Sequence, residues 1–404
     1  MPTDQLSALC QAVEAALSGG PPVTPKGWQP PGNLPPEAAL VVRSSGSTGQ
    51  PKLVWLTAAA VKASAKASAQ RLGGSGHWLL TLPTEHIAGL NVVARAVLAG
   101  TAPTAMTSPF TTAAFIEATR TMPPGRHFVS LVPTQLDRLL SNAAAVAHLS
   151  HFTAILLGGA AVPPHLMTQA RQYDLPLHLT YGMAETGGGC VYDGVPLEGV
   201  QVRLNASEPS GPDLDSSADG SVLPDVTGRI ELAGLTLAGG YLDQPAHHTA
   251  FTTRAGQRWY LSSDLGQWDG NGRLVVLGRL DHVIQTGGHK VAPELVERQV
   301  ASHPGITQVA VTALPDQQWG QVVTALVTGP NPPSLDQLRT WLKDHGNQTA
   351  VNGCPPHPAQ AGGLLRALGV VNQLPYLTPG KLDRAATAAL AQRLDAAGLI
   401  ERLR

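Results

Sequence analysis

The chain has 404 residues, enough for two or three domains, and 43% of them are hydrophobic, which suffices for a sizeable core. Its 27 Lys and Arg residues against 28 Asp and Glu residues give a formal net charge of −1. No run of five basic residues occurs, so the electrostatic footprint of a nucleic-acid-binding protein is missing. No apolar stretch reaches the ~18 residues that a membrane-spanning helix needs.

The first predicted element is a helix over the N-terminal sequence MPTDQLSALCQAVEAAL. Its amphipathic pattern and its lack of a basic start favour a helix of the mature protein over a signal peptide. The cysteines Cys10, Cys190 and Cys354 are far apart and show no CxxC spacing. This excludes a disulfide framework and a zinc site, and it indicates a cytoplasmic protein. The sequence leaves a homo-oligomer open.

Apolar runs alternate with helical patterns from about residue 38 to 182. This alternation predicts a mainly parallel sheet covered by helices. The predicted strands are 40–43, 77–83, 127–133, 152–159 and 175–182, and the predicted helices lie near 57–72, 87–99, 111–121, 133–142 and 163–173. Several of these strands end in polar or Gly-rich turns, which is where open α/β sheets bind ligands.

The pattern changes twice in the second half of the chain. Short strand-like pieces separated by turn signals predict a β-rich subdomain over about 190–280. Residues 281–404 then predict a small α+β domain, with helices near 292–302 and 334–344, strands at 306–314 and 321–328, a Pro/Gly-rich loop at 345–363, and a final strand and helix. The expected fold class is therefore α/β, with a large N-terminal domain over 1–280 and a small mobile domain over 281–404.

The stretch SSGSTGQPK, Ser44 to Lys52, follows the first strand and has the composition of a phosphate-binding loop. Glycines allow a close backbone approach, and N–H and hydroxyl groups donate to phosphate oxygens. It departs from the Walker pattern, because Pro51 precedes the lysine and Leu53 follows it. The alternative interpretation is an ordinary polar turn between two strands.

A second stretch, LPTEHIAGLNVVARAVLAG, places His86 at a strand-to-helix turn and puts Asn91 and Arg95 on one stripe of the helix. The planar fork of Arg95 suits a substrate carboxylate. The alternative is that Asn91 and Arg95 form a solvated face and that His86 only starts the helix.

Two Gly-rich strand ends form the third candidate region. Gly158 and Gly159 let a flat ring lie close to the backbone, and Tyr181 is placed to stack on that ring. Glu185 is a candidate Mg²⁺ ligand, because Mg²⁺ takes one or two carboxylates together with phosphate oxygens. The alternatives are a core aromatic for Tyr181 and a surface charge for Glu185.

Two further stretches carry charged candidates. In YLSSD, Asp264 is a suitable acceptor for two vicinal ribose hydroxyls, and Arg279 is expected to act on the same sugar. The alternative for this pair is a structural salt bridge. In PYLTPGKLDR, a Pro-Gly turn presents Lys381 on a loop, and the alternative is a solvent-exposed lysine.

Taken together, five motifs resemble the adenylate-forming superfamily in content, order and spacing: SSGSTGQPK, YGMAET, YLSSD, GRLDHVIQTGG and PYLTPGKLDR. The resemblance covers about residues 38–390 and has a shorter front end than is usual. Within the superfamily, LPTEHIAGLNVVARAVLAG, SLVPTQLDRLL and YGMAETGGGCVYDGVPLEGV are similar to the o-succinylbenzoate–CoA ligases of menaquinone biosynthesis. That subfamily is AMP-forming and uses ATP, Mg²⁺ and coenzyme A.

The resemblance implies adenylation of a carboxylic acid by Mg-ATP, followed by transfer of the acyl group to coenzyme A. It implies these roles: Lys381, Lys52 and His86 in catalysis; Ser44, Ser45, Gly46, Ser47, Thr48, Gly49, Gly158, Gly159, Ala160, Tyr181, Gly182, Asp264 and Arg279 in nucleotide binding; Arg95, His86, Gly182 and Met183 in acid binding; Gly287 and Gly288 at the coenzyme A channel; Asp281 at the hinge; and Glu185 on the metal.

The chain departs from the superfamily pattern at three places. Ala184 stands where Thr is usual, and we expect Ala184→Thr to raise the adenylation rate. Gln285 replaces a common lysine, and the 345–363 loop is unusual.

Alternatives to the o-succinylbenzoate ligase are a ligase for another aromatic or medium-chain acid, a nucleotide-binding module without turnover, and transfer to a carrier protein.

Overall fold

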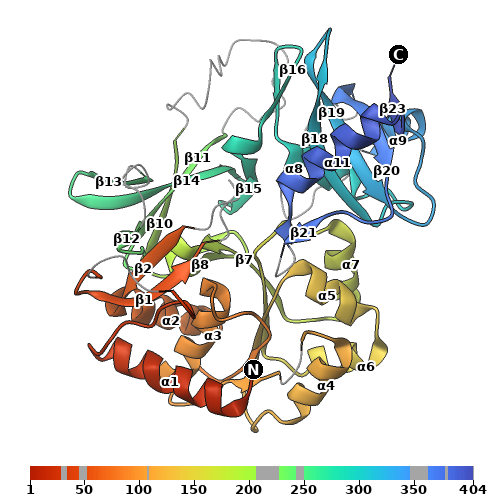
Figure 1. The fold of residues 1–404 in the computed structure, drawn as a ribbon. Helices are drawn as coiled ribbons and strands as arrows, with labels where there is room; N and C mark the ends of the chain where they lie inside the picture. The colour runs from red at the N-terminus through yellow and green to blue at the C-terminus, as the bar shows by residue number, and fades with distance from the viewer. Residues whose placement is uncertain are drawn as a thin grey trace. The chain divides into compact units, whose positions relative to one another are not determined.

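The protein is described by a computed structural model over residues 1–28, 34–44, 52–106, 109–205, 227–242, 250–345, 363–377 and 381–403. The chain forms two compact units (Figure 1). Unit 1 contains Met1–Ala160, Thr168–Val202 and Glu231–Leu261. Unit 2 contains Ala161–Met167, Arg203–Ile230 and Ser262–Arg404.

Unit 1 is built around a seven-stranded sheet with the order β4-β3-β5-β6-β7-β8-β9. The first five strands in this order run parallel, and β8 and β9 are added antiparallel. All four residues of β6 are buried, as expected for a parallel strand covered on both faces. The strands are β3 (His77–Leu80), β4 (Thr104–Ala105), β5 (His127–Leu131), β6 (Ala154–Leu157), β7 (Leu177–Met183), β8 (Gly188–Tyr192) and β9 (Val195–Pro196).

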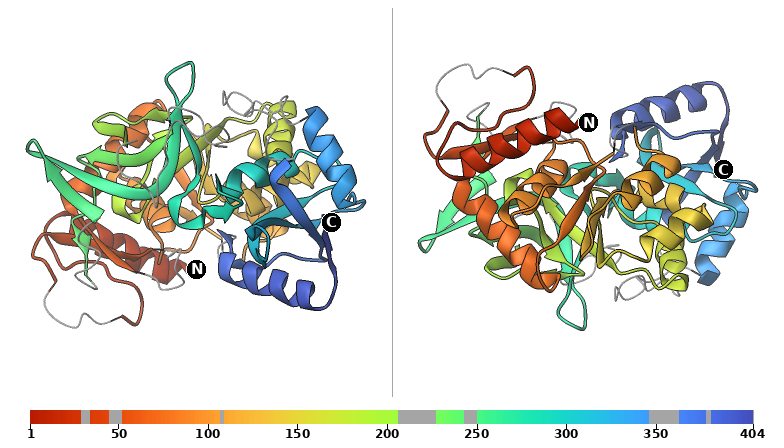
Figure 2. Two further views of the ribbon diagram at one scale, coloured as in Figure 1. Left: turned by 90° about the horizontal axis from the view of Figure 1, so that it is seen from above. Right: turned by 90° about the horizontal axis from the view of Figure 1, so that it is seen from below.

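The helices of unit 1 form two groups. One group consists of α1 (Thr3–Leu17), α2 (Ala58–Arg71) and α3 (Ile87–Leu98), and the other of α4 (Thr112–Arg120), α5 (Pro133–Leu140) and α6 (Ala143–Leu149) (Figures 1 and 2). Side chains of Thr57, Thr111 and Asn142 accept backbone N–H groups at the starts of α2, α4 and α6. The predicted α/β class is confirmed, although α6 was not predicted.

A three-stranded antiparallel sheet of β1 (Ala38–Arg43), β2 (Leu53–Thr57) and β12 (Gly240–Tyr241) carries the two ends of the SSGSTGQPK stretch. The β-rich segment forms a five-stranded sheet with the order β10-β11-β14-β13, in which β15 also pairs with β14. Its strands are β10 (Val200–Asn205), β11 (Gly228–Gly234), β13 (Phe251–Arg254), β14 (Gln257–Trp268) and β15 (Leu274–Arg279).

Unit 2 contains a four-stranded sheet with the order β18-β19-β20-β23 and helices packed on it. Because successive strand residues face opposite sides, Val323, Ala325 and Val327 pack with α8 and α9, whereas Val322 and Leu326 pack with α11. The elements are α8 (Pro293–Val300), β18 (Gln308–Asp316), β19 (Gly320–Thr328), α9 (Leu335–His345), β20 (Leu365–Val370), α11 (Arg384–Ala396) and β23 (Ile400–Arg402). This part agrees with the predicted small α+β fold.

The boundary between the two units differs from the predicted domain boundary at residue 280, because residues 262–280 belong to unit 2. The domain boundary and the hinge at Asp281 therefore stay predictions. The described helix α7 (Pro164–Gln172) contributes to both units. Within the described ranges, no helix is both long enough and apolar enough to cross a membrane.

Candidate active site

The SSGSTGQPK stretch is closed at its base by two hydrogen bonds between its ends. The Ser44 N–H donates to the Lys52 carbonyl at 2.8 Å, and the Lys52 N–H donates to Ser44 Oγ at 3.2 Å. The strands on either side pair at Arg43 and Leu53. Ser44 and Lys52 are therefore held side by side. The other predicted loop residues, Ser45, Gly46, Ser47, Thr48 and Gly49, lie outside the described residues.

Lys52, Tyr241 and Glu185 come together in unit 1 from three distant segments. The Tyr241 hydroxyl donates to Glu185 Oε1 at 2.7 Å, and Lys52 Nζ lies 5.4 Å from the centre of the Tyr241 ring. Glu185 is only 6% exposed, so the alternative of a surface charge is wrong. Burial, together with the charge of Glu185, raises the pKa of Tyr241, which therefore stays a hydrogen-bond donor. Sequence reasoning missed Tyr241, because β12 has no motif of its own.

The Glu185 turn is held by side chains of α2 and α3. Glu185 lies in a 3₁₀ turn (Ala184–Thr186) that ends at Gly187, whose φ of +67° favours glycine. The Gly187 carbonyl accepts from Asn91 Nδ2 at 2.8 Å and from Ser64 Oγ at 3.1 Å. Asn91 is 4% exposed, so the solvated-face alternative is wrong for it. Its side chain instead positions the candidate metal ligand.

The ends of β6 and β7 lie side by side because these strands pair in parallel. A Cβ added at Gly158 would lie 2.3 Å from Thr180 Oγ1, and one added at Gly182 would lie 2.1 Å from the Gly188 carbonyl oxygen. Gly159 has a φ of +82° and is exposed with Ala160. Tyr181 and Met183 are half-buried on β7. This edge leaves backbone and one aromatic ring accessible, as a nucleotide base requires.

His86 and Arg95 lie at opposite ends of α3. His86 is the N-cap residue, and its Nδ1 lies 3.3 Å from the Arg43 carbonyl oxygen. Arg95 is 8% exposed, so it is not part of a solvated face; its Nη2 donates to the Tyr192 hydroxyl at 3.2 Å, and its guanidinium carbon lies 5.0 Å from the Trp78 ring centre.

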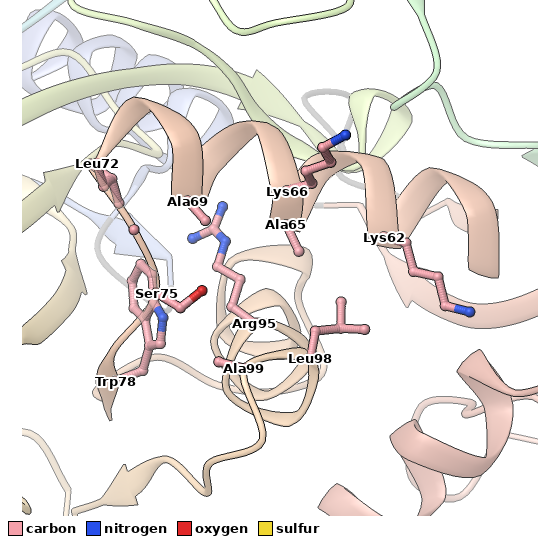
Figure 3. Close-up of a pocket in the computed structure, with 11 residues that line it drawn as sticks. Lys62, Ala65, Lys66, Ala69, Leu72, Ser75, Trp78, Arg95, Leu98 and Ala99 are labelled. Atoms are coloured by element: carbon pink, nitrogen blue, oxygen red, sulfur yellow. The ribbon is translucent and has the colours of Figure 1, made fainter.

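Arg95 lines a pocket of about 300 Å³ (Figure 3). The other three residues predicted to bind the acid, His86, Gly182 and Met183, do not line this pocket.

In unit 2, Asp264 and Arg279 are cross-strand neighbours on β14 and β15. Arg279 Nη1 donates to Asp264 Oδ1 at 3.2 Å, and Arg279 also donates to Asp281 through Nε at 2.8 Å and Nη2 at 2.7 Å. Asp264 is 7% exposed. The salt-bridge alternative thus describes the geometry observed, and the ribose-binding role of Asp264 stays a prediction.

Lys381 belongs to the same cluster. It starts β22 (Lys381–Leu382), which pairs with β21 (Tyr376–Leu377). Burial and the positive charge of Arg279 lower the pKa of Lys381, and Asp264 and Asp281 partly oppose this. Lys381 is half-buried, so the alternative of a solvent-exposed lysine is wrong. The structure therefore brings three predicted residues, Asp264, Arg279 and Lys381, into one electrostatic environment.

A charged network beside this cluster was not predicted. His282 Nδ1 lies 2.7 Å from Glu294 Oε1, and Arg384 donates to Glu294 at 3.3 Å and to Glu297 Oε2 at 2.8 Å. Burial would raise the pKa of Glu294, but His282 and Arg384 lower it overall; burial raises the pKa of Glu297 despite Arg384. The available sequence signal was the i, i+3 spacing of the two glutamates on α8.

Gly287 and Gly288, predicted at the coenzyme A channel, form a hairpin turn between β16 (Ile284–Thr286) and β17 (His289–Val291). Their φ angles are +54° and +83°, the positive values of a type I′ turn. A Cβ on Gly287 would lie 2.3 Å from Trp319 Cε3, so this glycine lets the turn lie on the indole ring. Gln285 is exposed on β16.

Two family models match the chain. The AMP-binding enzyme model matches residues 7–242, and the AMP-binding enzyme C-terminal domain model matches residues 295–355. A protein of Mycobacterium tuberculosis named "Probable 2-succinylbenzoate--CoA ligase" is 40% identical over 357 residues, 87% of this chain and 84% of that protein. The 2-succinylbenzoate--CoA ligase of Escherichia coli is 32% identical over 78% of this chain, which spans 63% of that protein.

Solved structures show the same relationship. The o-succinylbenzoate CoA synthetase of Bacillus subtilis, in complex with its acyl-adenylate intermediate, matches with a TM-score of 0.65 and 26% identity, over 86% of this chain and 68% of that chain. The amide bond synthetase McbA of Marinactinospora thermotolerans matches in fold, with a TM-score of 0.70 and 23% identity over 91% of this chain and 72% of that chain. This chain belongs to the AMP-binding enzyme family.

Proposed function

We propose that this protein is an AMP-forming acid–thiol ligase that converts o-succinylbenzoate (2-succinylbenzoate), ATP and coenzyme A into o-succinylbenzoyl-CoA, AMP and pyrophosphate. The observation that carries the proposal is the 40% identity with the mycobacterial relative over 87% of this chain. A carboxylate oxygen of the acid attacks the α-phosphorus of ATP, and the bond to the bridging oxygen breaks to release pyrophosphate. The thiolate of coenzyme A then displaces AMP from the acyl carbon.

The residues of unit 1 fit the triphosphate end of this chemistry. The Ser44–Lys52 loop would donate to the phosphates, with Lys52 as a cation. Glu185 fits a magnesium ion, because Mg²⁺ is held by one or two carboxylates together with phosphate oxygens. The Tyr241 hydroxyl donates to Oε1 of Glu185 and so fixes the orientation of this carboxylate. Magnesium, when bound, would neutralise phosphate charge. The Bacillus subtilis enzyme has been solved with ATP and magnesium ion, at 25% identity.

The remaining predicted residues complete the proposal. Tyr181 and the segment Gly158 to Ala160 would border adenine, Asp264 and Arg279 would hold the ribose, and Lys381 would bridge the acid carboxylate and the α-phosphate. Arg95 would receive the second carboxylate of the acid, with Gly182, Met183 and His86 nearer the reacting carboxylate. Rotation about Asp281 would bring Gly287 and Gly288 to the coenzyme A channel, between domains at 1–280 and 281–404. We place the enzyme in the cytoplasm.

Pyrophosphate release tests the proposed function. The purified chain is incubated with Mg-ATP and coenzyme A and one acid at a time: o-succinylbenzoate, benzoate, a medium-chain fatty acid, or no acid. We expect o-succinylbenzoate to give the highest kcat/KM, and mass spectrometry to identify its CoA thioester. A higher kcat/KM for benzoate or the fatty acid would reject the substrate. Nucleotide binding without pyrophosphate release from any acid would reject the ligase activity.

A further inference from the structure

The segment from Ala238 to Tyr241 holds Glu185 at two points. The Ala238 N–H donates to the Glu185 carbonyl oxygen at 2.9 Å, and the Tyr241 hydroxyl donates to Glu185 Oε1 at 2.7 Å. The first bond fixes the backbone of the candidate metal ligand, and the second fixes its carboxylate. The position of Glu185 therefore depends on where this short segment lies.

Trp55 of β2 contacts the segment through both its backbone and its ring. The Gly239 N–H donates to the Trp55 carbonyl oxygen at 2.9 Å, and Gly240 and Tyr241 pair with β2. A Cβ added at Gly239 would lie 2.2 Å from Cη2 of the Trp55 ring. The glycine therefore allows the backbone of the segment to lie directly against the indole.

Arg258 of β14 binds two carbonyl groups of the same segment. Its Nη1 donates to the Ala238 carbonyl oxygen at 2.6 Å, and its Nη2 donates to the Gly239 carbonyl oxygen at 2.8 Å. Two charge-assisted bonds from one planar group restrict both the position and the orientation of the peptide units that accept them. The N–H groups of the same two residues donate to Glu185 and Trp55. Arg258 thus holds the segment that holds Glu185.

Phe251 connects Arg258 to Tyr241 by a second route. The guanidinium carbon of Arg258 lies 4.2 Å from the centre of the Phe251 ring. The Phe251 ring meets the Tyr241 ring edge to face, with 5.7 Å between the ring centres. Stacked guanidinium and aromatic groups attract one another, as do rings in this orientation. Loss of Arg258 would therefore loosen Tyr241 through its backbone and through its ring.

We propose that Arg258 is a positioning residue for the magnesium site at Glu185, and that it acts through the Ala238–Tyr241 segment rather than by contact with the metal. The inference rests on the proposed function, in which Glu185 binds the magnesium ion of Mg-ATP, and it adds a residue that sets the affinity for the metal. Without Arg258, the Glu185 carboxylate loses its fixed orientation. Nucleotide with magnesium should then bind more weakly, whereas nucleotide without the metal should bind as before.

Isothermal titration calorimetry of the full chain with α,β-methylene-ATP tests this role. The analogue has no bridging oxygen between the α- and β-phosphorus atoms, so no pyrophosphate is released during the titration. One titration contains magnesium chloride and the other contains EDTA. The Kd with EDTA divided by the Kd with magnesium measures how much the metal contributes. Arg258→Met should lower this ratio about tenfold, as is typical for groups that orient a metal ligand, and leave the Kd with EDTA nearly unchanged.

Two further variants separate positioning from a general loss of structure. Arg258→Lys keeps a cation that can donate to a carbonyl, and it should lower the ratio less than Arg258→Met. Arg254→Met removes another arginine of the same hairpin, one that donates to both carboxylate oxygens of Glu231 at 2.9 Å. This control should lower the melting temperature and leave the ratio unchanged. Melting curves from circular dichroism show which variants fold, and Arg258→Lys decides the question if Arg258→Met does not fold.

Two outcomes would overturn the proposal. One is a ratio in the folded Arg258 variants equal to that of the unmodified chain. The other is that magnesium does not tighten binding of the analogue to the unmodified chain. Failure of the proposed function looks different. The unmodified chain would then bind the analogue more tightly with magnesium, and the Arg258 variants would lower the ratio, but no acid would give pyrophosphate release from ATP.

Discussion

The two parts of the candidate active site are built from different interactions. In unit 1, Glu185 is held by a neutral phenol and by a turn whose carbonyl accepts from Asn91 and Ser64. In unit 2, ion pairs and hydrogen bonds connect a run of charged side chains around Lys381: Asp264, Arg279, Asp281, His282, Glu294, Arg384 and Glu297.

This difference has a physical consequence. The hydrogen bonds from Asn91 and Ser64 to the Gly187 carbonyl join neutral groups, and such bonds depend little on pH and salt. Partly exposed ion pairs respond to pH and to salt. A change in protonation removes one of the two charges, and salt screens the attraction between them. We therefore expect the geometry around Glu185 to stay the same when pH or salt changes, and the protonation state of Lys381 to change with them.

The largest effect is expected for Lys381→Ala. If Lys381 bridges the carboxylate and the α-phosphate, its removal should slow adenylation by roughly 10²–10³-fold, and leave thioester formation from supplied acyl-adenylate nearly unchanged. Pyrophosphate release measures the first step, and the CoA thioester formed from synthetic adenylate measures the second. Lys343→Ala removes an exposed lysine of α9 and serves as the control. An equal loss in both steps would contradict the role given to Lys381.

Arg384→Met should destabilise unit 2. Its removal leaves Glu294 and Glu297 buried without their shared cation, and breaking a buried pair costs about 3–5 kcal/mol in the free energy of unfolding. Arg402→Met removes a more exposed arginine paired with Asp395 and Asp316, and should cost ~1 kcal/mol or less. Urea denaturation of both variants measures the difference. Equal free energies would mean that the Arg384 network does not stabilise the unit.

Sequence reasoning served the two parts differently. The parallel strands, their helices and the glycine turns were predictable because periodicity and turn chemistry are local properties. Glu185 and Lys381 stood in motifs and were predicted as candidates. Tyr241 was not, because its two-residue strand reaches Glu185 only through pairing with β2, a contact distant in sequence.

The same limit explains the other omissions. His282, Glu294 and Arg384 meet through the packing of α8 and α11 on one sheet, and no local pattern encodes that meeting. The orientation of Arg95 was equally hidden. Its position on the helix stripe was predicted, but its stacking on Trp78 and its bond to Tyr192 depend on β3 and β8. Distant partners decide what a polar side chain contacts.

Tyr241→Phe tests the neutral part of the contrast. The variant keeps the ring and removes one hydrogen bond to a buried carboxylate, so adenylation should fall about tenfold. The loss should lessen as the magnesium concentration is raised, because the hydroxyl acts by positioning Glu185. Rates measured over a magnesium titration separate this effect from a general loss of activity. Tyr173→Phe, at a residue 47% exposed, should change neither rate nor magnesium dependence.

Asp281→Asn tests the charged part. Asp281 raises the pKa of Lys381, so its removal should lower that pKa further. Adenylation requires protonated Lys381, so the rate should fall as the pH rises through the pKa of this lysine. The alkaline limb of the pH profile should therefore move to lower pH in the variant, by less than about one unit. High salt should reduce the shift, because Asp281 is partly exposed. Movement of the limb to higher pH would contradict this sign.

The smallest effect is expected at Ala184, beside Glu185. Ala184 is 4% exposed and packs in the main hydrophobic cluster of unit 1, so Ala184→Thr places a hydroxyl partly among apolar neighbours. A new hydrogen bond to phosphate would speed adenylation, whereas burying the hydroxyl costs about 1–3 kcal/mol when it is unpaired. We expect a rate increase below about tenfold together with a lower melting temperature.

Ala118→Thr provides the control for this variant, because Ala118 is also buried but lies on α4. It should lower the melting temperature without raising the rate. If Ala184→Thr leaves the adenylation rate unchanged or lowers it, the hydroxyl does not reach the phosphate. The site in unit 1 would then tolerate alanine at position 184, because two hydrogen bonds already determine where Glu185 lies. These are the bond from Tyr241 to Glu185 and the bond from Asn91 to the Gly187 carbonyl.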